Sequence, residues 1–148
     1  MLFLNVQQIL AYITLLLLLA SCSSTLRDVR EEEPSKTGLF AIEPLPLAYC
    51  VEWTVGQQPS PLSYQLIQDP LIHQASLFAR KKDDVSPEPW VPFELTFRHL
   101  SPSSTLVELR EGYPRSDEEG KSWAAPAWQA VEQCPETIKG DKSRREGR

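Results

Sequence analysis

The fold of this chain is decided by residues 93–110, which read FELTFRHLSPSSTLVELR. Apolar and polar side chains alternate on both sides of a Ser-Pro-Ser-Ser turn. Alternation with a period of two is typical of a strand with one buried face, and two such runs joined by a short turn predict a β-hairpin. The buried face would carry the odd-numbered apolar residues, namely Phe93, Leu95, Phe97, Val107 and Leu109.

The register of this hairpin is restricted by the same pattern. Because both apolar sets are odd-numbered, residues that face each other must have numbers with an even sum. A sum of 204 pairs Glu94 with Arg110, whereas a sum of 206 pairs Arg98 with Glu108. Both registers place opposite charges across the exposed face, which stabilises a strand pair by a few tenths of a kcal/mol.

Three further segments are expected to form regular elements beside this hairpin, two of them strands of the same sheet and the third a helix. Residues 49–55 alternate, with Tyr49, Val51, Trp53 and Val55 on one face, and predict a half-buried strand. Leu62, Tyr64 and Leu66 predict a shorter one. Asp69 and Pro70 are typical of a helix start, so residues 71–80 are expected to be helical, with a strand over residues 71–79 as the alternative.

A helix is also expected near the end of the chain. Trp123, Ala127, Val131 and Cys134 lie near one stripe, which indicates a helix over residues 126–134 that Pro135 would end. The predicted fold class is therefore α+β, a small antiparallel sheet of three or four strands with one or two packed helices. The domain is expected to occupy residues 44–138.

The N-terminal 21 residues differ from the rest of the chain. Sixteen of them are hydrophobic and none is charged, and the apolar run is about the length of a signal-peptide core rather than of a membrane span. The run ends in Leu19-Ala20-Ser21-Cys22, which is similar to the lipobox of bacterial lipoproteins.

This resemblance implies removal of residues 1–21 as a signal peptide and lipidation of Cys22. Leu19, Ala20 and Ser21 would be read by the signal peptidase, and acyl chains such as palmitate would anchor the chain in a lipid bilayer. Ser23, at the position where Asp retains enterobacterial lipoproteins in the inner membrane, implies the periplasmic side of the outer membrane. The inner membrane is the alternative.

The cysteine count agrees with export. Three cysteines leave an odd one in an exported protein, and lipidation of Cys22 leaves Cys50 and Cys134 as a pair. An oxidising periplasm favours a disulfide between them. Between Cys22 and residue 43 the sequence is polar and without periodicity, which predicts a flexible tether (residues 22–43). The charged residues 139–148 predict a disordered tail.

Composition and motifs exclude several functions. With 148 residues and a net charge of −5, the chain has no electrostatic footprint for nucleic acid and is too short for a multidomain enzyme. No catalytic motif, phosphate-binding glycine loop or metal-ligand spacing is found in the sequence, so no catalytic residue, metal or cofactor is predicted. His73 is expected to be exposed, and His99 to be a hydrogen-bonded residue at the hairpin edge.

Trp90 is the residue that most suggests binding. It lies in a proline-rich loop, where an exposed indole could anchor a protein partner or stack on a glycan; packing over the edge of the core is the alternative. The expected function is that of a non-catalytic accessory or adaptor lipoprotein with a protein partner in a cell-envelope complex. The alternative is a lysozyme-inhibitor-like or glycan-binding lipoprotein.

Overall fold

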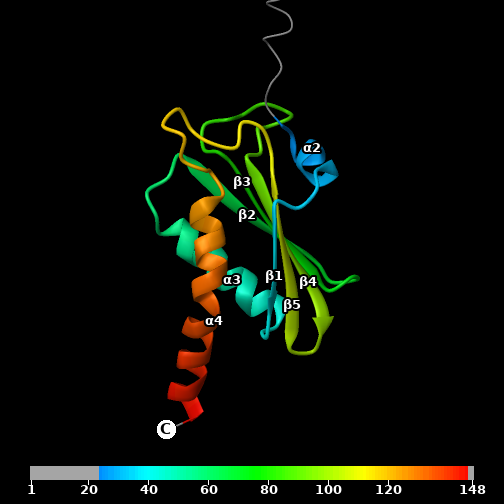
Figure 1. The fold of residues 1–148 in the computed structure, drawn as a ribbon, viewed down its shortest axis with the longest axis vertical. Helices are drawn as coiled ribbons and strands as arrows, with labels where there is room; N and C mark the ends of the chain where they lie inside the picture. The colour runs from blue at the N-terminus through cyan, green and yellow to red at the C-terminus, as the bar shows by residue number, and fades with distance from the viewer. Residues whose placement is uncertain (1–23, 147–148) are drawn as a thin grey trace, which may run out of the picture.

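The computed structural model describes residues 24–146 and has an α+β fold (Figure 1). The predicted signal peptide (residues 1–21), with Leu19, Ala20 and Ser21, and the predicted lipidation site Cys22 lie outside the described residues. Along the chain the described elements are α2 (Leu26–Glu31), β1 (Lys36–Phe40), α3 (Pro44–Gly56), β2 (Leu62–Asp69), β3 (Gln74–Lys81), β4 (Phe93–Ser101), β5 (Ser104–Glu111) and α4 (Ala125–Glu146).

One antiparallel sheet contains all five of these strands, in the order β1-β5-β4-β3-β2. The sequence predicted three or four strands, so the sheet is slightly larger than expected. The β4–β5 hairpin is confirmed in the register with a sum of 204, because Glu94 pairs with Arg110 and Phe97 with Val107. β1 and β2 form the two edges of the sheet.

The main core lies between one face of the sheet and the helices α3 and α4, which lie on the same side of it (Figure 1). The odd-numbered side chains of the hairpin, including Phe93 and Phe97, are fully buried there as predicted. Near the start of β4 the opposite face is covered by α2, whose Val29 is buried against Phe78 and Val91.

The predicted strand over residues 49–55 is wrong, because these residues belong to α3. Pro44 occupies the start of α3, where the missing N–H of proline costs no helical hydrogen bond. Leu47, Val51 and Val55 are buried at a spacing of four residues, whereas Tyr49 and Trp53 point outward. The alternation in the sequence was compatible with both periods, and packing on the sheet decided for the helical one.

Residues 71–80 are not a helix, and the alternative interpretation as a strand is the better one. β3 pairs with β2 on one side and with β4 on the other. The segment from Pro70 to His73 forms the β2–β3 turn, in which His73 has a positive φ of 49°. Asp69 still makes a local cap, but it does so by accepting a hydrogen bond from the turn N–H of Leu71 at 3.0 Å.

The flexible tether predicted for residues 22–43 is wrong over its described part, residues 24–43, because this part contains α2 and β1. Thr25 and Asp28 form a capping box at the start of α2. β1 then adds to the sheet along β5. This contribution has no periodic signal in the sequence, because much of β1 is exposed at a sheet edge.

The disordered tail is likewise corrected, since α4 continues past Pro135 and Lys139 to Glu146. The helix is therefore longer than the predicted segment 126–134, and proline does not end it. Among the described residues, none of the helices combines the length and the hydropathy needed to cross a membrane.

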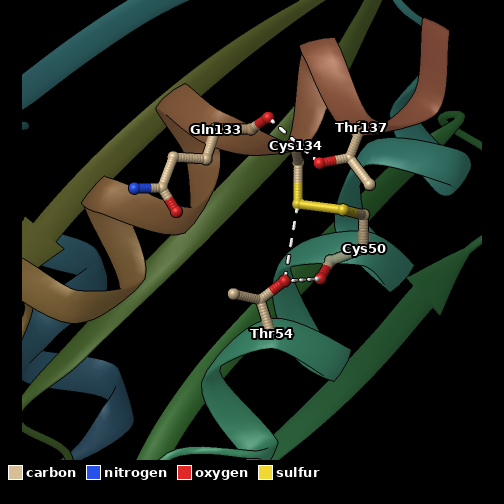
Figure 2. The surroundings of a disulfide bond; sticks show 5 residues. All are labelled: Cys50, Thr54, Gln133, Cys134 and Thr137. Carbon is tan, nitrogen blue, oxygen red and sulfur yellow. Dashed lines mark hydrogen bonds between the residues drawn. A yellow bond between two sulfur atoms is a disulfide. The ribbon is translucent and has the colours of Figure 1, made fainter. Parts of the chain in front are cut away.

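The predicted disulfide is confirmed, and it joins α3 to α4 through Cys50 and Cys134 (Figure 2). The two Cα atoms are 5.9 Å apart and 84 positions apart in the sequence. Beside it, the hydroxyl of Thr54 donates to the carbonyl of Cys50 at 2.8 Å and lies 3.8 Å from Sγ of Cys134. The bond fixes the two helices against each other on the sheet.

Candidate functional site

A cleft of about 440 Å³ opens where the β2–β3 hairpin turn and the end of β4 meet the start of α3. We call it the far-end cleft, because it is lined by His99 and Pro102 at the end of β4, whereas Ser24, the first described residue, is hydrogen-bonded to Val91 just before β4 begins. Its lining residues come from three segments that are distant in sequence. The lining residues are Glu43, Pro44, Leu45, Gln68, Asp69, Pro70, His73, Gln74, His99 and Pro102.

The start of α3 is held in place by a buried hydrogen bond. The hydroxyl of Thr105, on β5, donates to the carbonyl of Ile42 at 2.6 Å, and Thr105 is fully buried. This contact fixes the chain immediately before Glu43, the N-cap residue of α3. The side chain of Glu43 makes no capping hydrogen bond and is exposed at the mouth of the cleft.

Two histidines lie together in the cleft. The imidazole rings of His73 and His99 have centroids 5.8 Å apart, and the backbone N–H of His99 donates to the carbonyl of His73 at 3.3 Å. Within residues 24–146 neither imidazole hydrogen-bonds to another side chain, so the predicted hydrogen-bonded role of the His99 side chain is wrong. The left-handed backbone of His73 is uncommon for a residue with a side chain, and such conformations concentrate at functional positions.

The charge of the far-end cleft is negative when both histidines are neutral. Glu43 and Asp69 line it, and none of the lining residues is lysine or arginine. A carboxylate pair without a cation favours a positively charged group on whatever enters. The described residues contain no cluster of three or more His, Cys, Asp or Glu side chains arranged for a metal ion. The charge of the lining therefore favours a cationic group on whatever enters the cleft.

A rim of exposed apolar side chains belongs to, or directly adjoins in sequence, the segments that line the far-end cleft. Leu71, in the β2–β3 turn, has 89% of its surface exposed, and Ile72 beside it is also exposed. Leu100 near the β4–β5 turn and Leu45 on α3 extend the same rim. A soluble protein rarely gathers exposed aliphatic side chains around a hollow unless another surface covers them. The cleft and this rim together are called the far-end surface.

A row of larger side chains leads away from this surface along α3. Leu45, Tyr49 and Trp53 are spaced four residues apart and are all exposed, with 71% of the surface of Trp53 accessible. The hydroxyl of Tyr49 accepts a hydrogen bond from the Gln68 amide on the edge strand β2. We call these three residues the α3 ridge; it continues the far-end surface along the open edge of the sheet.

Trp90 lies elsewhere, near Ser24, and it is half-buried. Its ring packs edge-on against Trp123 with centroids 5.4 Å apart, and its indole N–H donates to the carbonyl of Tyr113 at 3.1 Å. The backbone N–H of Trp90 donates to Asp84 at 2.9 Å. These contacts match the alternative of an indole folded over the edge of the core.

The pKa of Asp84 is lowered by this arrangement. The hydrogen bond from the Ser86 hydroxyl contributes most to the shift, followed by the backbone N–H of Trp90. The ionised carboxylate of Asp84 therefore stabilises the loop that carries Trp90, because it accepts these hydrogen bonds.

Sequence reasoning missed the α3 ridge because it placed Tyr49 and Trp53 on a buried strand face. A signal was present, since Pro44 and Pro46 precede a run with apolar residues at helical spacing. It also missed the far-end cleft, which only the pairing of β2, β3 and β4 assembles. No family model, curated protein or solved structure matches this chain significantly.

Proposed function

We propose that this chain is a lipid-anchored lipoprotein of the cell envelope that holds a protein partner and has no catalytic activity of its own. Its anchor would be acylated Cys22, on the periplasmic side of the outer membrane, with the inner membrane as the alternative. The similarity of Leu19-Ala20-Ser21-Cys22 to a lipobox supports the anchor. The Cys50–Cys134 disulfide suits an oxidising compartment.

The observation that carries the adaptor role is the far-end surface with its α3 ridge. Tyr and Trp are enriched among the residues that dominate protein–protein binding, and here Tyr49 and Trp53 are exposed beside apolar neighbours. Glu43 and Asp69 supply charge at one end of the same surface. The partner would accordingly present an apolar patch bordered by lysine or arginine.

The anchor is tested by labelling cells with a palmitate analogue. The chain is expected to incorporate the label, and Cys22→Ala is expected to lose it. Cys134→Ala is the matched control, since it also removes one cysteine but should keep the label. Labelling that survives in Cys22→Ala would contradict acylation at this residue.

The partner is tested by photocrosslinking in cells with benzoylphenylalanine incorporated at Leu71. One reproducible protein adduct is expected, whereas the same probe at Gln129, an exposed position on α4, should not give it. Trp53→Ala should reduce the adduct by about tenfold, because loss of one dominant interface residue costs roughly 1–2 kcal/mol or more. If the Trp53→Ala variant gave the same adduct yield at Leu71 as the parent chain, the α3 ridge would not be part of the binding surface.

The glycan-binding and lysozyme-inhibitor alternative also rests on Trp53, because an exposed indole is a surface on which a sugar ring can stack. Cosedimentation with purified peptidoglycan and inhibition of lysozyme by the purified protein test it. Activity in either assay that Trp53→Ala abolishes would favour this alternative over the adaptor.

A further inference from the structure

We infer that the end of the domain around Ser24 rests directly on the phospholipid headgroups, so that the far-end surface faces away from the membrane. This inference depends on the proposed acylation of Cys22. It goes beyond that proposal because it assigns a second membrane contact, made by the loops of the folded domain, and a fixed orientation.

Ser24 is part of the folded domain. Its backbone N–H donates to the carbonyl of Tyr113 at 3.0 Å, and its carbonyl accepts from the N–H of Val91 at 2.9 Å. Its hydroxyl accepts from the N–H of Tyr113 at 2.7 Å. Three hydrogen bonds to two separate loops leave no free rotation between Ser24 and the sheet.

The residues after Ser24 reinforce this attachment. Val29 of α2 is fully buried, and Arg30 makes a two-pronged contact with the carboxylate of Glu94. Gly112 packs so closely that an added Cβ would lie 2.8 Å from Cβ of Ser24 and 2.5 Å from the carbonyl of Val91. The segment predicted as a tether is thus a fixed layer of the domain.

The covalent connection between Cys22 and the folded domain is short. One residue, Ser23, separates Cys22 from Ser24, and each residue spans at most about 3.6 Å. The Cα atoms of Cys22 and Ser24 are therefore at most about 7 Å apart, which is similar to the depth of one headgroup layer. An acylated Cys22 cannot reach the bilayer unless Ser24 comes to its surface.

Two loops of the folded domain lie at the same end as Ser24. The loops between β3 and β4 and between β5 and α4 lie at the same end of the molecule as the start of α2 (Figure 1). They are linked to Ser24 by contacts that run from Asp84 through Trp90 to Tyr113. Val85 has 97% of its surface exposed, and Tyr113 has 61% exposed. An exposed aliphatic side chain and an exposed tyrosine on the loops at this end suit the boundary between headgroups and acyl chains.

Charge does not account for this contact. The two loops and their flanks contain more carboxylates than basic side chains, so attraction to anionic lipid is not the cause. The anchor would hold the loops at the surface, and zwitterionic phospholipid suffices. The side chains concerned are Lys81, Lys82, Arg115 and Lys121 against Asp83, Asp84, Glu88, Glu111, Asp117, Glu118 and Glu119.

The consequence for the far-end surface is geometric. β4 runs for nine residues from Phe93, two positions after Val91, to Ser101, which lies between His99 and Pro102 of the far-end cleft. At about 3.3 Å per residue, the cleft stands roughly 25–30 Å from the membrane end. It is presented to the periplasm at a fixed height.

The test uses the full-length acylated protein in vesicles of phosphatidylethanolamine and phosphatidylglycerol. Benzoylphenylalanine is incorporated at Val85, or at Ser103 in the β4–β5 turn as the matched control, and lipid adducts are measured by mass spectrometry after illumination. Adducts are expected at Val85 at about tenfold the yield at Ser103. The yield at Val85 should not change when phosphatidylglycerol is left out.

A third variant carries eight Gly and Ser residues inserted between Ser23 and Ser24. Its linker spans roughly 15 Å as a flexible coil, so the Val85 adduct is expected to fall several-fold while acylation is unchanged. Acylated protein with equal yields at Val85 and Ser103, or with no effect of the insertion, overturns the orientation and leaves the lipoprotein proposal intact. A chain of unacylated mass that does not float with the vesicles overturns both.

Discussion

Glu94 is a charged residue in a place that disfavours charge, since only 2% of its surface is exposed. Arg30 compensates it, with guanidinium nitrogens 2.8–3.2 Å from its two carboxylate oxygens. The hydrogen bond to Glu94 is the main reason that the pKa of Arg30 is raised. Strand pairing places Arg110 opposite Glu94, yet Arg110 donates instead to Glu108 and to the carbonyl of Glu32.

We expect Arg30→Met to lower the free energy of unfolding by about 1–3 kcal/mol, because a buried carboxylate would lose its counterion. The lower part of the range for buried pairs applies, since half of the Arg30 side chain is exposed. Urea unfolding measures the change. Arg27→Met is the control; Arg27 pairs with Glu31 on the surface, and its loss should cost less than about 0.5 kcal/mol. Equal effects of the two variants would contradict this account.

Asp84 predicts a pH dependence of stability. Because its pKa is lowered in the folded protein, its contribution is present above the unfolded pKa of about 3.9 and is lost as the pH falls through the folded value. Asp84→Asn should therefore be less stable than the wild type near pH 6, and the gap should close below about pH 4. Thermal unfolding across this range measures it, with Asp83→Asn as the neighbouring control. A gap that widens on acidification would have the wrong sign.

At the scale of elements, the junction between α2 and the end of β5 depends on Gly112. A methyl group there would meet Cγ2 of Val29 at 2.7 Å as well as the backbone of Val91. Gly112→Ala is expected to cost about 1–3 kcal/mol by overpacking, measured by urea unfolding.

Gly140 provides the matched comparison, because a Cβ there would meet nothing within 4 Å. It lies within α4, so Gly140→Ala should increase helix content and stabilise the protein by up to about 1 kcal/mol. If both glycine variants were neutral, α2 would not be packed as tightly as the structure shows.

The elements also differ in how far the sequence foretold them. The hairpin of β4 and β5 has one face in the core, so the sequence alternates and predicts both strands. The same alternation restricts the register to pairs whose residue numbers have an even sum. α3 was misread because Val51 and Val55 fit both a strand and a helix, and only burial against the sheet separates the two periods. β1 left no pattern, because an edge strand with exposed side chains obtains its stability from backbone pairing with β5.

At the scale of the whole molecule, the disulfide is the covalent constraint on the fold. Cys50 and Cys134 close a loop of 84 residues that contains four of the five strands described. The chain-entropy model values such a crosslink at roughly 4–5 kcal/mol, a large share of a typical stability of about 5–15 kcal/mol.

Replacing both Cys50 and Cys134 with Ala should lower the free energy of unfolding by about 4 kcal/mol, measured by urea unfolding in detergent. Cys22→Ala serves as the control, because it removes a cysteine without opening the loop. A loss below about 1 kcal/mol would mean that packing alone holds α3 on α4.

The sequence by itself determined the hairpin, the cysteine pair and the resemblance to a lipobox, because each depends on local pattern or on a count of residues. It did not determine that residues 24–43 join the fold, since hydrogen bonds such as those from Ser24 to Tyr113 link positions about ninety residues apart. The far-end cleft also belongs to the tertiary structure. His73, His99 and Glu43 have no common motif, and they meet only because antiparallel pairing brings the ends of distant strands and the start of α3 to one end of the sheet.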